Sequence, residues 1–297
     1  FGGRRFGDHG GPSRKRERET STPLSGSCQM KGKGVFCPAM ANVLEHSFRP
    51  RLSDLALALV FLTRLPWPGA LDATRPVGRV AWAFPLIGAA LGGLAGLVWQ
   101  VAASLALPTA LAAGVVVAAL ALVTGGLHVD GLANSADGLA NSRLGAAALA
   151  IMRDSRVGAH GVLAMLLAVG LKWGAVAAWP PATVFAALIA LHAWARALML
   201  LPVWIAGPAT SDGLGAAGAF AWREAALALA LAAAVGLLAL PAPVFLAMAA
   251  VSGLVVGGFG WLAKRRIGGY TGDVLGASEQ LAETAGAVTL VAALAAF

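Results

Sequence analysis

Charge is scarce in this sequence. Asp, Glu, Lys and Arg make up 12% of the 297 residues, and none of them occurs from Val80 to Leu127. Hydrophobic residues make up 58%, and the mean hydropathy is +0.76. A soluble domain of this length carries about twice that share of charged residues. The composition therefore excludes an ordinary soluble domain and predicts an integral membrane protein.

Cysteine is nearly absent as well. Cys28 and Cys37 have no neighbouring Cys or His pair at a metal-ligand spacing, so they predict no metal site. Both lie in residues 1–51, a stretch without apolar periodicity that we expect to be a disordered tail. Because the sequence starts on Phe, Met30 and Met40 are both plausible native starts, and the residues before them could be a mis-assigned start or an expression remnant. An alternative is a basic arm on anionic lipid.

The excess of positive charge belongs to that tail. Residues 1–52 hold ten of the 22 Lys and Arg residues and four of the 14 Asp and Glu residues, a net charge of +6, and the rest of the chain carries the other +2. A basic body would have suggested nucleic acid as a partner. Because the positive charge lies in the tail, we expect no nucleic acid as a partner.

The body, 52–297, divides into apolar segments long enough to cross a bilayer as helices. The expected spans are 80–102, 109–125, 160–179, 183–205, 224–240, 243–262 and 282–297. The apolar segment 53–63 is too short to cross, so we expect an interfacial or re-entrant helix there. The fold class is therefore all-α: a polytopic membrane protein with about six or seven transmembrane helices and one short interfacial helix.

The connections between these spans alternate between two kinds. Those around 104–109, 179–182 and 240–243 are short and uncharged, whereas 64–79, 125–157, 206–223 and 263–281 carry almost every charge of the body, Asp212 included. Because loops rich in Lys and Arg stay in the cytoplasm, we expect the polar segments, and with them the active site, at the cytoplasmic face.

The first polar motif is TGGLHVDGLANSADGL, 124–139. On a helix, Asp130, Asn134 and Asp137 are four and three residues apart, which places their oxygens on one face. Hard oxygen ligands in this arrangement suit Mg²⁺ or Mn²⁺. The alternative is that the two carboxylates only cap and solvate an amphipathic loop helix.

Two further motifs favour the metal interpretation. IMRDSRVGAHG, 151–161, combines Asp154 with Arg153 and Arg156, and guanidinium groups beside carboxylates are typical of a pyrophosphate site. GGYTGDVLGASEQLAE, 268–283, adds a Gly-rich turn, Asp273, Glu279 and Glu283.

Few polar residues lie within the expected spans. Charged residues inside membrane helices usually face the protein interior or a polar cavity, so we expect Arg196 to reach a bound anion or an acidic side chain. Lys172 is interpreted as a packing or snorkelling lysine, and His192 as a helix-packing residue.

Together with FLTRLP at 61–66 and FPLIG at 84–88, these three motifs resemble, in order and spacing, the cobalamin synthase family, or adenosylcobinamide-GDP ribazoletransferases. The resemblance runs from about Leu52 to the C-terminus. It implies a multi-pass enzyme of the bacterial inner membrane that uses Mg²⁺ and joins adenosylcobinamide-GDP to the 5′-oxygen of α-ribazole, or to its 5′-phosphate, with release of GMP. It also implies the bilayer as a partner, and leaves open other corrinoid-pathway proteins and a homo-oligomer.

Residue roles follow as hypotheses from the resemblance and the motifs together. Metal ligands would be Asp130, Asp137, Asp154, Asp273 and Asn134, although the family commonly has Asp where this chain has Asn134. Substrate-binding residues would be Arg153, Ser155, Arg156, Arg196, Thr271, Glu279 and Glu283. His128 or His160 would be the general base, because imidazole has a suitable pKa, and the carboxylates are alternatives.

Two other classes of membrane protein remain as alternatives. A CDP-alcohol phosphotransferase also uses carboxylates on Mg²⁺ in a membrane bundle, but its acidic signature has a different spacing. A transporter would place polar groups near the bilayer midplane, whereas this sequence gathers them at one surface.

Overall fold

The computed structural model describes residues 29–31, 34–36, 50–72, 74–211, 220 and 222–296. By its internal contacts the chain divides into two units, 1–47 and 48–297. In the first unit, strands β1 (Gln29–Lys31) and β2 (Gly34–Phe36) pair antiparallel. The disorder predicted for the remainder of the tail concerns residues outside the described part, as does the position of Asp212.

The second unit is helical, which confirms the all-α class. Its helices are α2 (Ser53–Leu62), α3 (Val77–Val80), the 3-10 turn η1 (Ala81–Ala83), α4 (Phe84–Ser104), α5 (Thr109–Thr124), α6 (Leu127–Ala140), α7 (Ala146–Met152), α8 (Ala159–Ala178), α9 (Val184–Leu198), α10 (Leu201–Ile205), α12 (Trp222–Ala239), α13 (Ala242–Ile267) and α14 (Gly272–Ala295).

Five helical stretches among the described residues are long and apolar enough to cross a membrane. They are Val77–Ser104, Ala159–Ala178, Val184–Ile205, Trp222–Ala239 and Ala242–Ile267, and a sixth results if the bent pair α5 and α6 forms one span. These findings confirm a polytopic membrane protein. The predicted span 282–297 is instead the second half of α14, whose first half carries Asp273 and two glutamates and is not a loop.

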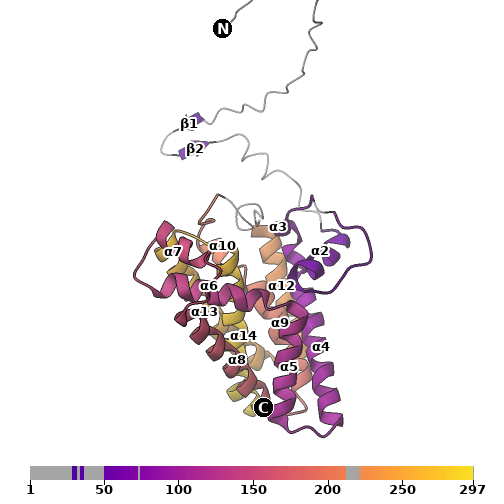
Figure 1. The fold of residues 1–297 in the computed structure, drawn as a ribbon. Helices are drawn as coiled ribbons and strands as arrows, with labels where there is room; N and C mark the ends of the chain where they lie inside the picture. Colours follow the sequence, from indigo (N-terminus) through magenta and orange to yellow (C-terminus); the bar gives the residue numbers. More distant parts are fainter. Residues whose placement is uncertain are drawn as a thin grey trace, which may run out of the picture. The chain divides into compact units, whose positions relative to one another are not determined.

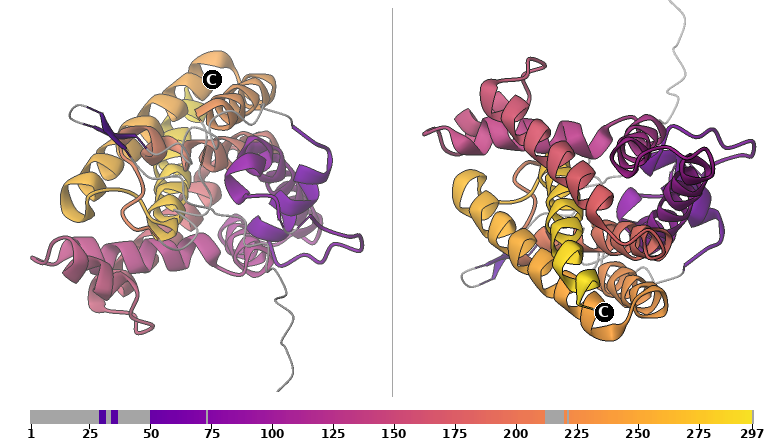
Figure 2. Two further views of the ribbon diagram at one scale, coloured as in Figure 1. Left: turned by 90° about the horizontal axis from the view of Figure 1, so that it is seen from above. Right: turned by 90° about the horizontal axis from the view of Figure 1, so that it is seen from below.

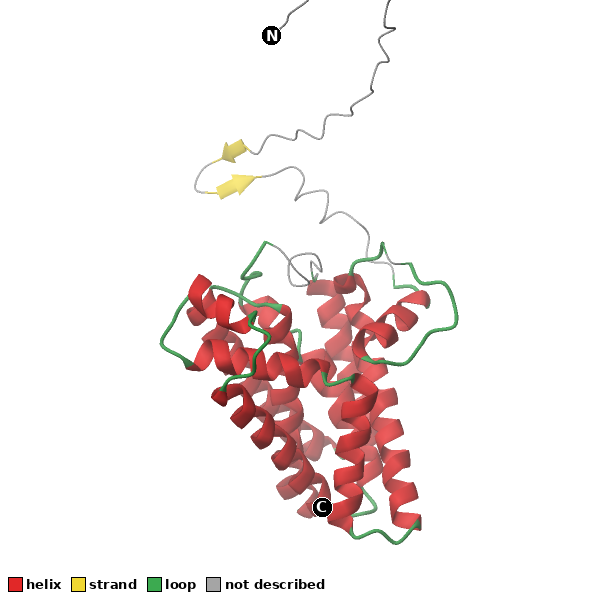
Figure 3. Cartoon of the chain, in the orientation of Figure 1, coloured by secondary structure: helices red, strands yellow, loops and turns green. Residues whose placement is uncertain are grey.

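The short helices gather at one end of the bundle. Figure 1 shows α2, α6, α7 and α10 at one end of the second unit, and the turn between α4 and α5 at the opposite end, beside the C-terminus. In Figure 3 the longer loops lie at the same end as the short helices. The alternation of polar and apolar connections in the sequence thus corresponds to two ends of one bundle.

Helices α4 and α9 approach each other closely because α4 presents glycine every fourth residue. A Cβ at Gly88 would collide with the His192 carbonyl, one at Gly92 with the Leu188 carbonyl, and one at Gly96 with the Phe185 ring. Small residues at this spacing let two membrane helices pack backbone against backbone. This packing fixes α9 deep in the bundle.

The chain breaks sharply between α5 and α6. Gly125 and Gly126 both have positive φ angles, 64° and 69°, a region that other residues rarely adopt. The two helices are bent by 89° at this break. As a result α6, which carries the first polar motif, lies across the end of the bundle instead of continuing α5.

Helix α14 lies at the centre of the bundle. In the views along the bundle it runs between its neighbours (Figure 2), and it packs on α13, α6, α8 and α9. Buried residues occur on every side of it, among them Glu279, Gln280 and Glu283. A helix that is buried all round tolerates such residues only where they are paired.

Candidate active site

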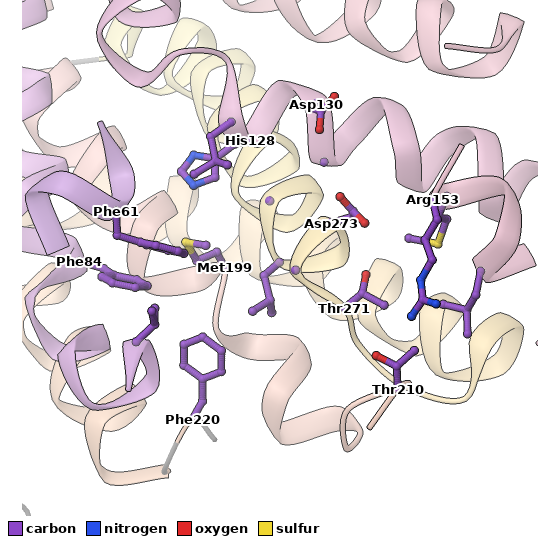
Figure 4. A pocket seen from close by; sticks show the side chains of 18 residues that line it. Phe61, Phe84, His128, Asp130, Arg153, Met199, Thr210, Phe220, Thr271 and Asp273 are labelled. Atoms are coloured by element: carbon purple, nitrogen blue, oxygen red, sulfur yellow. The ribbon is translucent and has the colours of Figure 1, made fainter. Parts of the chain in front are cut away.

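A cavity of about 290 Å³ lies among α2, α6, α7 and the start of α14. Its lining includes His128, Asp130, Arg153, Thr271 and Asp273, which come from all three polar motifs. Figure 4 shows these side chains around the cavity, together with Phe61, Phe84, Met199, Thr210 and Phe220. The fold therefore brings the three motifs to one place.

Asp130 and Asp273 meet at Asn134. The Asn134 Nδ2 lies 3.2 Å from a carboxylate oxygen of Asp130, one helical turn away on α6, and 3.2 Å from one of Asp273 on α14. Burial raises the pKa of Asp273, and the neighbouring charge of Asp130 adds to this, while the hydrogen bond from Asn134 opposes it. Two carboxylates held this close to one amide group suit a bound cation, because the cation would offset the repulsion between their charges.

Glycines allow this approach of α6 to α14. A Cβ at Gly131 would lie 2.9 Å from the Asp273 carbonyl oxygen, and one at Gly276 would lie 3.4 Å from the His128 Cα. The glycine after Asp130 in the first motif is therefore needed for packing, since a larger residue there would push the two carboxylates apart.

Asp137 points elsewhere, to the start of α8. Its Oδ2 accepts a 2.7 Å hydrogen bond from the Gly158 backbone N–H, and its Oδ1 accepts a 2.9 Å bond from that of Gly161. A Cβ on either glycine would collide with this carboxylate. A carboxylate at a helix N-terminus satisfies free N–H groups and the helix dipole. Asp137 thus joins α6 to α8 and does not meet Asp130 and Asp273.

The second motif separates into one residue at the cavity and several at the surface. Arg153 lines the cavity. Asp154 forms an exposed ion pair with Arg156, with 2.7 Å between Arg156 Nη2 and Asp154 Oδ2, and the hydrogen bonds from Arg156 lower the pKa of Asp154 to about 2. Ser155 and His160 are exposed as well.

His128 is buried, and one of its nitrogens is paired. Its Nδ1 lies 3.2 Å from Oε2 of Glu279. Its Nε2 is buried without a hydrogen-bond partner among the described residues. An imidazole whose Nδ1–H is held by a carboxylate keeps its Nε2 lone pair available to accept a proton.

Arg196 and Glu283 belong to an internal ion-pair network. The Arg196 Nη1 lies 3.0 Å from Glu279 Oε1 and 3.0 Å from Glu283 Oε1. Glu283 also contacts His192 at 2.5 Å and Lys172 at 3.0 Å. The expectation that Arg196 reaches an acidic side chain agrees with this geometry. We interpreted Lys172 and His192 as packing residues. In the structure Lys172 is a counter-charge of Glu283, and His192 is a hydrogen-bond partner of Glu283.

The cavity also contains residues that lie outside the three polar motifs. Phe61 lies in FLTRLP and Phe84 in FPLIG, and their rings stack with centroids 5.8 Å apart and an interplanar angle of 14°. Both segments look like ordinary apolar sequence. Only their place in the resemblance could have marked them as site residues.

Among the described residues, no three His, Cys, Asp or Glu side chains form a ready metal cluster. The acidic residues proposed as metal ligands are therefore divided: Asp130 and Asp273 lie together, Asp137 holds α8, and Asp154 pairs with Arg156. The metal hypothesis narrows to Asp130, Asn134 and Asp273.

Comparison with known proteins gives one family. The family model described as cobalamin-5-phosphate synthase matches residues 54–291. A protein of Bradyrhizobium diazoefficiens is 42% identical over 84% of this chain and 96% of its own, and one of Mesorhizobium japonicum is 37% identical over 85% and 97%. A protein of Xanthobacter autotrophicus is 42% identical over 77% of this chain and 92% of its own. All three carry the name adenosylcobinamide-GDP ribazoletransferase. No solved structure matches. The chain belongs to the cobalamin-5-phosphate synthase family.

Proposed function

We propose that the cavity is the active site of an adenosylcobinamide-GDP ribazoletransferase, which joins adenosylcobinamide-GDP to α-ribazole or its 5′-phosphate and releases GMP. Family membership supports this reaction over a CDP-alcohol phosphotransferase or a transporter. One observation supports this location of the active site. Asp130 and Asp273 lie on helices that are far apart in the sequence, yet both accept a hydrogen bond from the Asn134 amide at the wall of a cavity that Arg153 also lines.

The reaction is a substitution at the phosphorus that carries cobinamide. A ribose hydroxyl forms the new P–O bond, the bond from that phosphorus to the bridging oxygen breaks, and GMP leaves with the bridging oxygen. The family description names a cobalamin 5-phosphate. A 5′-oxygen that already carries a phosphate is not free to attack. We therefore assign the attack to a ring hydroxyl of the ribose instead of the 5′-oxygen that we expected.

The phosphates of adenosylcobinamide-GDP fit the polar side of the cavity. Arg153 presents a guanidinium group there, which matches phosphate oxygens in geometry and charge. Thr271 is the N-cap of α14, and it and Gly272 line the same wall. The N-terminus of this long helix carries a partial positive charge that favours an anion.

Asp130, Asp273 and the side-chain oxygen of Asn134 would hold Mg²⁺. Their donor set fits, because Mg²⁺ prefers a few carboxylate oxygens and keeps its other positions for water and substrate phosphate. For the amide oxygen to face the ion, Asn134 would turn its side chain over, since its nitrogen now faces both carboxylates. When bound, the ion neutralises charge that develops on the phosphate oxygens.

His128 is the better candidate for the general base. It lines the cavity, and Glu279 orients it with Nε2 free. This nitrogen would take the proton of the attacking hydroxyl while Glu279 stabilises the imidazolium that forms. His160 is exposed in the first turn of α8, and no contact brings it to the cavity wall.

We place the active-site end of the bundle at the cytoplasmic face of the inner membrane. Basic residues of the body cluster at this end, for example Arg143, Arg153 and Arg156 outside the spans and Lys264 and Arg266 in the last turn of α13. The excess of Lys and Arg in the loops that stay inside the cell supports this orientation.

The test is turnover by the full chain in lipid nanodiscs. The protein would be given adenosylcobinamide-GDP and α-ribazole, and GMP and the cobalamin product would be measured with and without Mg²⁺. We expect equal amounts of both products, dependent on Mg²⁺, and a loss of at least about 100-fold in kcat for Asp130→Asn. A folded protein that releases no GMP would contradict the proposed activity.

A further inference from the structure

The cavity has two chemically different halves. In Figure 4, Asp130, Arg153, Thr210, Thr271 and Asp273 lie on one side of it. The side chains of Phe61, Phe84, Met199 and Phe220 lie on the other. In the proposed reaction the polar half binds the phosphates of adenosylcobinamide-GDP. The apolar half needs a different ligand group.

The volume of the cavity limits which part of the substrates it can hold. Pockets for drug-sized ligands typically measure about 300–1,000 Å³, and this cavity measures about 290 Å³. It can enclose one nucleoside-sized group. A corrin macrocycle is too large, so the corrin must remain outside it.

Chemistry distinguishes the two planar bases that the substrates offer. The guanine of GDP carries a carbonyl, an amino group, one ring N–H and two ring nitrogens that accept hydrogen bonds, and each of these would lose hydrogen bonds to water on burial against phenylalanine and methionine side chains. An unpaired buried polar group costs about 1–3 kcal/mol. The benzimidazole base of ribazole has apolar edges and one free ring nitrogen, so it enters the same surroundings at little cost.

We propose that the apolar half binds the benzimidazole base of ribazole, against the stacked pair of Phe61 and Phe84 and the facing Phe220. This inference rests on the proposed function and specifies where that function's acceptor lies. His128 lies on the same side of the cavity as Phe61 and Met199 in Figure 4. A base bound in the apolar half is therefore next to His128, and its ribose can point towards the polar half, where the phosphorus is held.

The experiment uses Phe61→Leu and Phe220→Leu in nanodiscs, with Phe259→Leu as the matched control. Leucine keeps an apolar side chain but removes the flat ring, and aromatic packing of this kind corresponds to about a 3- to 10-fold change in an equilibrium constant. Phe259 is partly buried on α13 and does not line the cavity. Melting temperature and particle size would show that each variant is folded.

We expect KM for ribazole to rise about 3- to 10-fold in both cavity variants and to stay within 2-fold in the control. KM for adenosylcobinamide-GDP should stay within 2-fold in all three. Free benzimidazole should compete with ribazole and not with adenosylcobinamide-GDP. Calorimetry with ribazole and with GMP should show that only ribazole binds more weakly to the cavity variants.

Three results would overturn the inference: an unchanged ribazole KM in both folded cavity variants, an equal rise in the KM for adenosylcobinamide-GDP, or benzimidazole competing with that substrate. A failure of the proposed function has a different signature. In that case the wild-type protein would turn over neither substrate, while calorimetry would still report whether ribazole binds and whether Phe61→Leu weakens its binding.

Discussion

The carboxylate of Asp137 on α6 holds the first turn of α8 through the Gly158 backbone N–H, at 2.7 Å. Its other oxygen accepts from Gly161. The spacing in the sequence had grouped Asp137 with Asp130 as a metal ligand. In the fold it satisfies two N–H groups that would otherwise lack partners at the α8 N-terminus.

Replacing Asp137 by Ala should therefore destabilise the protein. We expect a loss of about 1–2 kcal/mol, because two backbone donors at the α8 N-terminus, one in an exposed and one in a half-buried hydrogen bond, lose a charged acceptor. Thermal unfolding in nanodiscs would measure it, and Asp154→Ala is the control, since Asp154 forms only an exposed ion pair that contributes little. If the Asp137→Ala variant kept its stability but its turnover no longer depended on Mg²⁺, Asp137 would be a metal ligand after all.

Replacing Asn134 by Asp should strengthen the response to Mg²⁺. The variant would place a third carboxylate between Asp130 and Asp273, and ligand charge raises the affinity for a hard cation. The Mg²⁺ concentration for half-maximal turnover should fall several-fold, and Asp273→Asn should raise it. Equal Mg²⁺ requirements in all three proteins would show that the ion binds elsewhere.

The raised pKa of Asp273 predicts how pH affects stability without metal. Its folded-state pKa lies above 3.8, so the folded protein binds this proton more tightly than the unfolded chain. The contribution favours the fold below about pH 3.8 and is lost as the pH rises through the folded-state pKa. Mg²⁺ should then raise the melting temperature less as the pH falls towards the folded-state pKa of Asp273, and Asp273→Asn should remove that pH dependence. If the Asp273→Asn variant kept this pH dependence, the assignment of Asp273 as a metal ligand would be wrong.

Alanine substitutions at His128 and His160 should have very different effects on kcat. His128→Ala should lower kcat about 10²- to 10⁴-fold, the usual contribution of a general base. His160→Ala should stay within about 2-fold, because its side chain is exposed on the surface. Single-turnover assays at saturating substrate would separate this effect from binding. A larger loss in the His160 variant would reverse the two roles.

Arg196 should matter for stability more than for substrate binding. It is buried between Glu279 and Glu283, and removal of one partner of a buried ion pair costs about 3–5 kcal/mol. Arg196→Met should lower the melting temperature strongly, whereas Arg196→Lys should recover part of the loss. A rise in KM for adenosylcobinamide-GDP in a fully stable Arg196→Lys variant would instead support direct contact with the substrate.

Much of the membrane architecture followed from apolar segment lengths. The boundaries of α4, α5 and α8, and of the stretch Val184–Ile205 formed by α9 and α10, agree with the expected spans to within a few residues, because about 20 apolar residues in a row permit little except a membrane helix. Helix α14 deviates because its first half is polar. Its glutamates are neutralised by Arg196 and Lys172 from other helices, and no local pattern reveals such partners.

The sequence by itself determined the membrane class, the family and the three polar motifs, because composition, hydrophobic length and motif spacing are properties of the chain alone. Only the tertiary structure decided which acids belong together. The spacing of Asp130 and Asp137 specifies positions on one helix, but the role of a carboxylate depends on what faces it: Asp273 for the first and the α8 N-terminus for the second. The same holds for Phe61 and Phe84, which stack at the cavity although they lie on different helices.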